Sequence, residues 1–218
     1  MYYSQHGEDK YLNDIIFRNY KNGVYIEMGA LDGVLYSNTK FFEDSLGWKG
    51  ILIEPNPYQF NNLLLNRPNN KLYNYLISNS YDQKKYKMFK TIHAAVSGVV
   101  DTLPENHYKK FFNNEENEML EQEEIYIKPV KLSDVVKDSG YNKIDLLCLD
   151  VEGHEEEVLK SYDFKVKINV IMIEMLEGED GGKKNDESNE RCREILRNNG
   201  YVYYSNIHWN EIWVLENI

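Results

Sequence analysis

Residues 144–149 (IDLLCL) are apolar at every position except Asp145, which is the pattern of a strand buried on both faces of a parallel sheet. Four further apolar runs lie at residues 24–28, 51–53, 72–77 and 170–173. Helix-like segments separate the runs, and this alternation is typical of a doubly wound sheet. The pattern therefore predicts an α/β fold built on one mostly parallel sheet.

Helix and turn signals between the runs support this prediction. Asn56 and Pro57 form an N-cap and first-position pair, and glutamates at 155–157 place negative charge in the first turn of a helix. After a last helix at 191–197, residues 201–215 have the pattern of two strands joined by a turn. This closing pair predicts one antiparallel strand at the edge of the sheet.

Two segments interrupt the alternation. Residues 78–131 are too long for a simple crossover, so they predict an insertion with an extra hairpin and helix. Residues 177–190 are polar and glycine-rich, and they follow a strand at the edge where such sheets bind ligands. We therefore predict a single domain over residues 1–218 with a lid loop at 177–190. A surface loop without a binding role is the alternative.

The residues after the first run carry the strongest functional signal. Glu27 is an acid at the end of a buried strand, which is costly unless something pairs with it. Gly29 and Gly33 let the following loop approach a ligand and turn tightly. The dinucleotide pattern G-x-G-x-x-G needs a third glycine and an immediate helix, whereas the next helix here begins near Ser37. The loop therefore favours a cofactor without phosphates.

Ionisable residues also follow three later runs. Glu54 ends the second, where a carboxylate can accept hydrogen bonds from both ribose hydroxyls of an adenosine. Asp150, Glu152 and His154 lie on the turn after the fourth, and Glu174 ends the fifth. These positions are at the binding edge of a doubly wound sheet.

The charge balance limits the partners. The chain has 25 Lys and Arg against 36 Asp and Glu, and its net charge of −11 disfavours nucleic acid and anionic membranes as partners. Its two cysteines form no disulfide framework, and no run approaches the roughly 18 apolar residues of a membrane span. We therefore expect a cytoplasmic protein in which Cys148 is a reduced core thiol.

Taken together, these motifs resemble the FkbM family of S-adenosylmethionine-dependent methyltransferases. The resemblance covers nearly the whole chain, from SQHGED at 4–9 through EMGALDG at 27–33, IEPNP at 53–57 and DVEGHE at 150–155 to IEM at 173–175. It implies a class I methyltransferase fold, which is Rossmann-like, with a seven-stranded sheet whose last strand is antiparallel. It also implies methylation of a hydroxyl, often on a sugar or a glycosylated product.

The resemblance implies that the cofactor is bound mainly by the loops after the strands. The residues concerned are Gln5, Glu27, Gly29, Ala30, Asp32, Ser37, Asn38, Glu54, Leu76, Ile77, Ser78 and Asp150. The glycine loop would wrap the methionine part, with Glu27 steadying it, and residues 37–38 would suit the carboxylate. Glu54 would bind the ribose, and residues 76–78 would border the adenine. Asp150 would lie near the sulfonium and the amino group.

Methyl transfer to a hydroxyl also needs a base that removes the proton. Imidazole titrates near neutral pH, so His154 is the first candidate and Asp150 the second. A structural role for His154 at a helix N-terminus is the alternative. Asp150, Glu152 and Glu174 would also suit Mg²⁺, but structural hydrogen bonding of Glu152 is favoured, and no metal site is predicted.

We therefore predict an S-adenosylmethionine-dependent O-methyltransferase that acts on a sugar hydroxyl in glycan biosynthesis, with a homodimer left open. A non-catalytic module that binds S-adenosylmethionine is one alternative, and Glu54, Asp150 and His154 argue against it. A nicotinamide-dependent dehydrogenase is another, and the missing third glycine argues against it.

Overall fold

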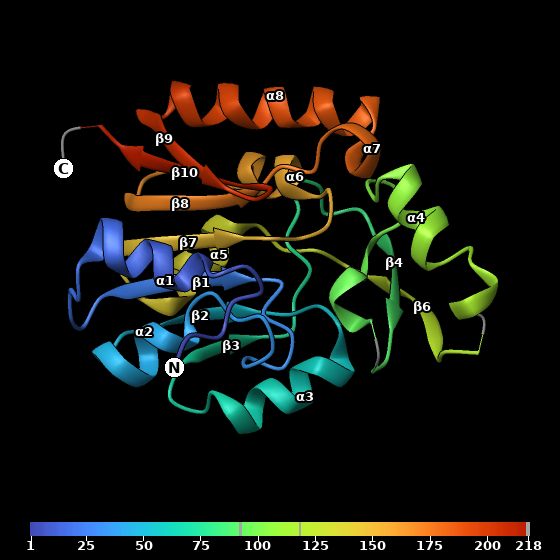
Figure 1. Cartoon of the computed structure of the whole chain (residues 1–218), viewed down its shortest axis with the longest axis horizontal. Helices are drawn as coiled ribbons and strands as arrows, with labels where there is room; N and C mark the ends of the chain where they lie inside the picture. The colour runs from blue at the N-terminus through green and yellow to red at the C-terminus, as the bar shows by residue number, and fades with distance from the viewer. Residues whose placement is uncertain (92, 118, 217–218) are drawn as a thin grey trace.

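A seven-stranded sheet forms the centre of the structure, a computed structural model that describes residues 1–91, 93–117 and 119–216 (Figure 1). The strand order is β3-β2-β1-β7-β8-β10-β9, and β10 runs antiparallel to the other six strands. The strands are β1 (Val24–Met28), β2 (Lys49–Ile53), β3 (Lys71–Tyr73), β7 (Ile144–Leu149), β8 (Ile168–Glu174), β9 (Tyr201–Ile207) and β10 (Asn210–Leu215). The predicted α/β sheet with its last strand antiparallel is therefore confirmed.

Helices cover both faces of this sheet. Ile26, Leu147 and Ile171 belong to the core under α5 (Leu132–Ser139), α6 (Glu155–Lys160) and α8 (Lys183–Asn198). The opposite face packs against the remaining helices around the sheet. These are α1 (Glu8–Tyr11), the π-helix η1 (Leu12–Phe17), α2 (Lys40–Leu46) and α3 (Pro57–Asn66). Among the described residues, no helix has the length and apolar character that crossing a membrane requires.

Two local signals explain where elements begin and end. The Asn56 side chain accepts a hydrogen bond from the Tyr58 amide at 3.0 Å, so the predicted cap of α3 is confirmed. The third strand is shorter than the predicted range 72–77: β3 comprises Lys71–Tyr73. The Asn74 side chain donates to the Glu54 carbonyl, and Ile77 forms an isolated bridge with Val130 outside the sheet.

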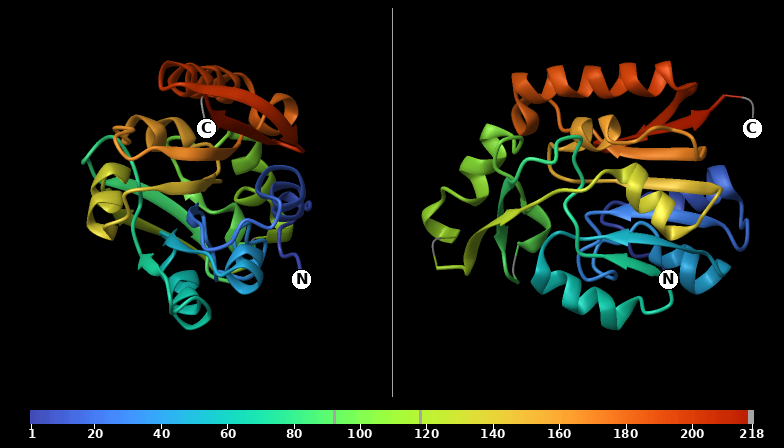
Figure 2. Two further views of the ribbon diagram at one scale, coloured as in Figure 1. Left: turned by 90° about the vertical axis from the view of Figure 1, so that its left-hand side faces the viewer. Right: turned by 180° about the vertical axis from the view of Figure 1, so that it is seen from behind.

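The range 78–131 folds mostly as a second, antiparallel sheet of order β5-β4-β6. Its elements are β4 (Lys84–Phe89), η2 (Ala94–Val96), β5 (Gly98–Val99), α4 (Glu105–Phe111), η3 (Glu115–Asn117) and β6 (Gln122–Ile127). Residues 92 and 118 of this range lie outside the described residues. The insertion stands at one end of the molecule, beyond the carboxyl ends of the parallel strands (Figures 1 and 2).

The prediction of a loop at residues 177–190 is wrong. The segment forms α7 (Gly178–Gly181) and the first half of α8, separated by Gly182 at φ 77°. The Asn185 and Asn189 side chains donate to the Leu176 carbonyl at 2.7 and 2.9 Å, which ties the start of α8 to the end of β8. The side chains at 179 and 180 lie outside the described residues. The composition indicated a loop, but these buried amide contacts hold a helix.

Candidate functional site

Two adjoining cavities open where the parallel strands end. The first lies along the loops after β1, β2, β7 and β8, and the insertion closes it with Tyr86 and Val99. The second, of about 480 Å³, lies between the insertion, the N-terminal segment and the β9–β10 turn. Both have Asp150, Glu152 and Glu174 in their walls. The predicted binding edge of the sheet therefore contains a continuous site.

Gly29 brings two of these loops into contact. It has φ 73°, and a Cβ at this position would come 2.1 Å from the backbone oxygen of Asp150. No larger residue fits there without moving the β7 loop. Gly29 therefore sets how closely the loop after β1 approaches Asp150.

Glu27 is satisfied from within the chain. Its carboxylate accepts hydrogen bonds from Ser37 Oγ at 2.9 Å, the Asn38 amide at 2.6 Å and Thr39 Oγ1 at 2.6 Å. Arg67 Nη1 lies 3.7 Å away. Burial raises the pKa of Glu27, and Arg67 and the three donors oppose that shift. This arrangement fits the predicted role of Glu27 in steadying the loop.

Glu54 is buried at the end of β2, with 2% of its surface exposed, and it lines the first cavity. Its two oxygens accept the amides of Leu31 at 2.8 Å and Asn56 at 2.7 Å. Burial raises its pKa to about 7, although both amides oppose the shift. A carboxylate has about four acceptor sites, so two contacts leave capacity for a ligand.

Asp150, Glu152 and Glu174 form an acidic group that the two cavities share. One ligand atom from each lies within 4.8 Å of the others, close enough to hold one divalent cation. Burial, followed by repulsion from Glu8, raises the pKa of Asp150 to about 6. Burial and then repulsion from Asp150 hold the pKa values of Glu152 and Glu174 well above their usual range. The absence of a metal requirement stays a prediction.

His154 lies directly before α6 and is 2% exposed. Its Nδ1 lies 3.0 Å from Thr102 Oγ1 of the insertion. Burial lowers its pKa to about 4, since the charged imidazolium is disfavoured away from water. His154 lines the first cavity, but a group with this pKa is a weak base at neutral pH.

Most of the predicted cofactor residues come together. Gln5, Glu27, Gly29, Ser37, Asn38, Glu54, Leu76, Ile77 and Asp150 all line the first cavity. Three others lie outside the lining of both cavities. Ala30 packs in the core, Asp32 accepts the amides of Val34 and Leu35, and the Ser78 amide donates to the Val130 carbonyl. None of residues 177–190 with a described side chain lines either cavity.

The insertion supplies residues that sequence reasoning did not assign. Tyr86 is 4% exposed and lines the first cavity, and repulsion from Glu54 contributes to the rise of its pKa, after burial. His107 on α4 places Nδ1 3.2 Å from Glu152 Oε2. The alternation in KKYKMF at 84–89 indicates a strand with Tyr86 and Met88 on one face, but no sequence signal pairs His107 with Glu152.

The unpartnered polar atoms of the site share one location. Among the described side chains, three buried polar atoms lack a hydrogen-bond partner: Asn38 Oδ1, His154 Nε2 and Glu174 Oε2. All three residues line the first cavity. Because buried polar groups in folded proteins are nearly always hydrogen-bonded, their gathering here indicates a polar ligand.

Comparison with known proteins identifies one matching family model and weaker likenesses to solved structures. Residues 27–203 match the profile of a family described as "Methyltransferase FkbM domain". A solved structure titled "METTL16 MTase domain" is 14% identical with a TM-score of 0.48, and the alignment covers 96% of this chain and 66% of that one. The N-terminal domain of human METTL16 is also 14% identical, with a TM-score of 0.44 and coverage of 94% and 66%. This chain thus spans 66% of the length of those structures, and no curated protein matches it.

Proposed function

The chain belongs to the FkbM methyltransferase family, and we propose that it transfers a methyl group from S-adenosylmethionine to a sugar hydroxyl in glycan biosynthesis. One observation carries the proposal. Buried Glu54 and three unpartnered polar atoms line the same cavity at the carboxyl ends of the strands. A ligand with hydroxyl, amino and carboxylate groups would satisfy them.

The lining of the first cavity suits each part of this cofactor. S-adenosylmethionine supplies an activated methyl group when bound. Glu54 would accept hydrogen bonds from the ribose hydroxyls, and Leu76 and Ile77 would border the adenine. The carboxyl groups of Asp150 and Glu174 favour a positively charged sulfonium and amino group beside them.

Asp150 is the better candidate for the base. Its pKa of about 6 is closer to neutral pH than the value of about 4 for His154, so Asp150 combines an ionised form with useful basicity. It also lies in the wall that the two cavities share, where a hydroxyl from the second cavity would meet the first. His154, bonded to Thr102, would instead hold the loop after β7 against the insertion.

Calorimetry and thermal unfolding with S-adenosylhomocysteine, S-adenosylmethionine and NAD test the cofactor assignment. We expect both sulfur compounds to bind and NAD to have no effect. At a hundredfold excess over Kd, a ligand specific for the folded state adds about 2.7 kcal/mol of stability. Glu54→Gln should weaken S-adenosylhomocysteine binding about 10- to 100-fold, since it replaces a charged acceptor.

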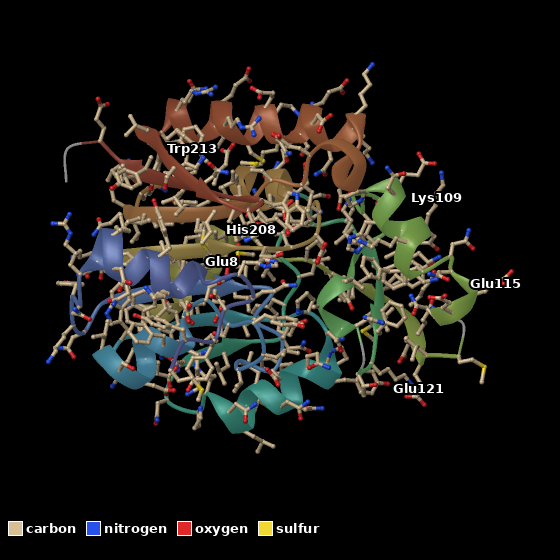
Figure 3. The ribbon with its side chains drawn as sticks, viewed as in Figure 1. Glu8, Lys109, Glu115, Glu121, His208 and Trp213 are labelled. Atoms are coloured by element: carbon tan, nitrogen blue, oxygen red, sulfur yellow. The ribbon has the colours of Figure 1, made fainter. Side chains whose placement is uncertain are left out.

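Glu121→Gln is the matched control, because Glu121 is exposed on the insertion (Figure 3). It should bind like the wild type. Stabilisation by NAD alone would favour the dehydrogenase alternative. Binding of the sulfur compounds without transfer to any glycoside or oligosaccharide tested would favour the non-catalytic module.

A further inference from the structure

The second cavity has the size of a small-molecule site and meets the first at its acidic wall. Its volume of about 480 Å³ lies within the range of about 300–1,000 Å³ that such sites occupy. The Met175 amide donates to the Trp209 carbonyl at 2.8 Å, which fixes the β9–β10 turn beside Glu174. A molecule in this cavity would therefore lie next to Asp150 and Glu174, where the first cavity begins.

Exposed aromatic rings line the outer part of this cavity. Trp209 is 42% exposed, whereas Trp48 and Trp213 are each 1% exposed. Tyr36, in the facing loop, is 43% exposed and also lines the cavity. The His6 ring lies 6.1 Å from the Trp209 ring in an edge-on arrangement. An indole exposed inside a cavity offers an apolar face to a flat ligand, and the C–H face of a pyranose ring is such a ligand.

Polar groups surround these rings, as a molecule with many hydroxyls requires. Gln5, Gln59 and Asn210 all line the cavity. The Asn210 side chain donates to Glu8 Oε1 at 3.4 Å, and Glu8 and His208 lie at the centre of the view in Figure 3. Amide side chains both donate and accept hydrogen bonds, so they can pair with sugar hydroxyls that act as acceptors or as donors.

The charges of the lining select against phosphates. Four carboxyl groups line the cavity, from Glu8, Asp150, Glu152 and Glu174, and Lys110 is the one lysine or arginine in the described lining. Proteins bind phosphates mainly through lysine, arginine and backbone N–H donors, so a lining with one such side chain gives a diphosphate little charge compensation. The acceptor would then be a sugar that is not attached to a phosphate or another anionic group.

We propose that the second cavity is the acceptor subsite and that it binds an uncharged saccharide ring stacked on Trp209. The proposal rests on the proposed function, because it takes the first cavity as the cofactor site. It adds the class of acceptor: a neutral glycoside or oligosaccharide, as opposed to a nucleotide sugar. Trp209 is then a residue that determines specificity.

Tryptophan fluorescence reports directly on this subsite, since Trp209 is the exposed tryptophan and the other two are buried. The protein saturated with S-adenosylhomocysteine is titrated with methyl glycosides of common hexoses and 6-deoxyhexoses, with cellobiose and with UDP-glucose. We expect saturable fluorescence changes with at least one neutral saccharide and binding of UDP-glucose at least tenfold weaker. Saturation-transfer NMR of the same panel gives binding independently of the tryptophan signal.

Three variants complete the test. Trp209→Ala should weaken saccharide binding at least tenfold by NMR, and Trp209→Phe should retain most of it. Tyr126→Ala is the matched control, because Tyr126 is 65% exposed on β6 and lines neither cavity. All three should bind S-adenosylhomocysteine like the wild type by calorimetry.

The failures are distinguishable. If the wild type does not bind S-adenosylhomocysteine, the proposed function is overturned, whether or not saccharides bind. Intact cofactor binding with no saccharide signal, with UDP-glucose bound as tightly as neutral saccharides, or with Trp209→Ala unchanged would overturn the acceptor subsite alone.

Discussion

Glu27 and Glu174 both stand at the carboxyl ends of parallel strands, yet their surroundings are opposite. Glu27 accepts three hydrogen bonds, and the fully buried Arg67 guanidinium lies beside it. In Glu174, Oε2 is buried without a partner, the carboxyl group shares a hydrogen bond with Asp150, and the surrounding acids Asp150, Glu152 and Glu155 raise its pKa after burial. Within the described part of the chain, Glu27 therefore has an arginine beside it and Glu174 has none.

This difference separates a structural acid from one available to a ligand. Arg67 also donates to the Tyr25 hydroxyl at 2.6 Å and to the Gly33 carbonyl at 2.8 Å, and it forms an ion pair with Glu43. These contacts join α2, α3, β1 and the glycine loop around Glu27. Among the described residues, no lysine or arginine forms an ion pair with Asp150, Glu152 or Glu174, and the basic side chain beside this group is His107, 3.2 Å from Glu152. A positively charged ligand would therefore relieve the repulsion within the group.

Arg67→Met should destabilise the protein more than the other variants, because it would leave Glu27 buried without a counter-charge. We expect the free energy of unfolding to fall by about 3–5 kcal/mol. Urea unfolding at pH 7 measures it. A double variant, Arg67→Met with Glu27→Gln, should recover part of the loss. An unchanged midpoint in the single variant would mean that the ion pair has no structural role.

Thr39→Val tests the hydrogen bonds of the same site at constant shape. The Thr39 hydroxyl is fully buried; it donates to Glu27 at 2.6 Å and accepts from Arg67 Nη2 at 3.0 Å. Losing a hydrogen bond to a charged group should cost about 2 kcal/mol. The same urea series measures this cost, and Thr91→Val on the exposed loop serves as control. Equal stability of the two variants would show that the hydrogen bonds from Ser37 and Asn38 are enough to stabilise the buried Glu27 carboxylate.

The comparison also shows what a sequence can predict. The apolar runs predict the main sheet, and the strand-end positions of Glu27, Glu54 and Glu174 bring these acids to one edge. The sequence does not tell which acid is compensated, since Arg67, the residue directly after α3, lies beside Glu27 from 40 residues later in the chain.

Long-range packing likewise determines features of the structure that the local sequence does not predict. Residues 177–190 are helical because two buried asparagines bond to Leu176, a contact that composition does not encode. The ordinary pKa of imidazole favours His154 as the base, and this assignment stays a prediction. The insertion that buries His154, through Thr102 among others, lowers that pKa to about 4.

Glu174→Gln should have the smallest effect on the free energy of unfolding, and it should raise this free energy at high pH where the other two variants lower it. The pKa of Asp150 is raised to about 6, and those of Glu152 and Glu174 are raised further above their usual range. The folded state therefore binds more protons than the unfolded state above about pH 4. The stability contributed by this group is complete at low pH and falls as pH rises through these raised pKa values. Glu174→Gln removes one of the repelling charges, so the decline should be shallower.

Denaturant unfolding of the ligand-free protein at several pH values measures that slope. At pH 4.5 wild type and Glu174→Gln should be equally stable, because Glu174 is then protonated in the folded state. At pH 8 the variant should be more stable by about 1 kcal/mol, since it lacks one of the buried, mutually repelling charges. His154, with a pKa of about 4, changes stability in the opposite direction, but it is present in both proteins and cancels in the difference. A variant that is less stable than the wild type at pH 8 would mean that Glu174, like Glu27, is compensated from within the chain.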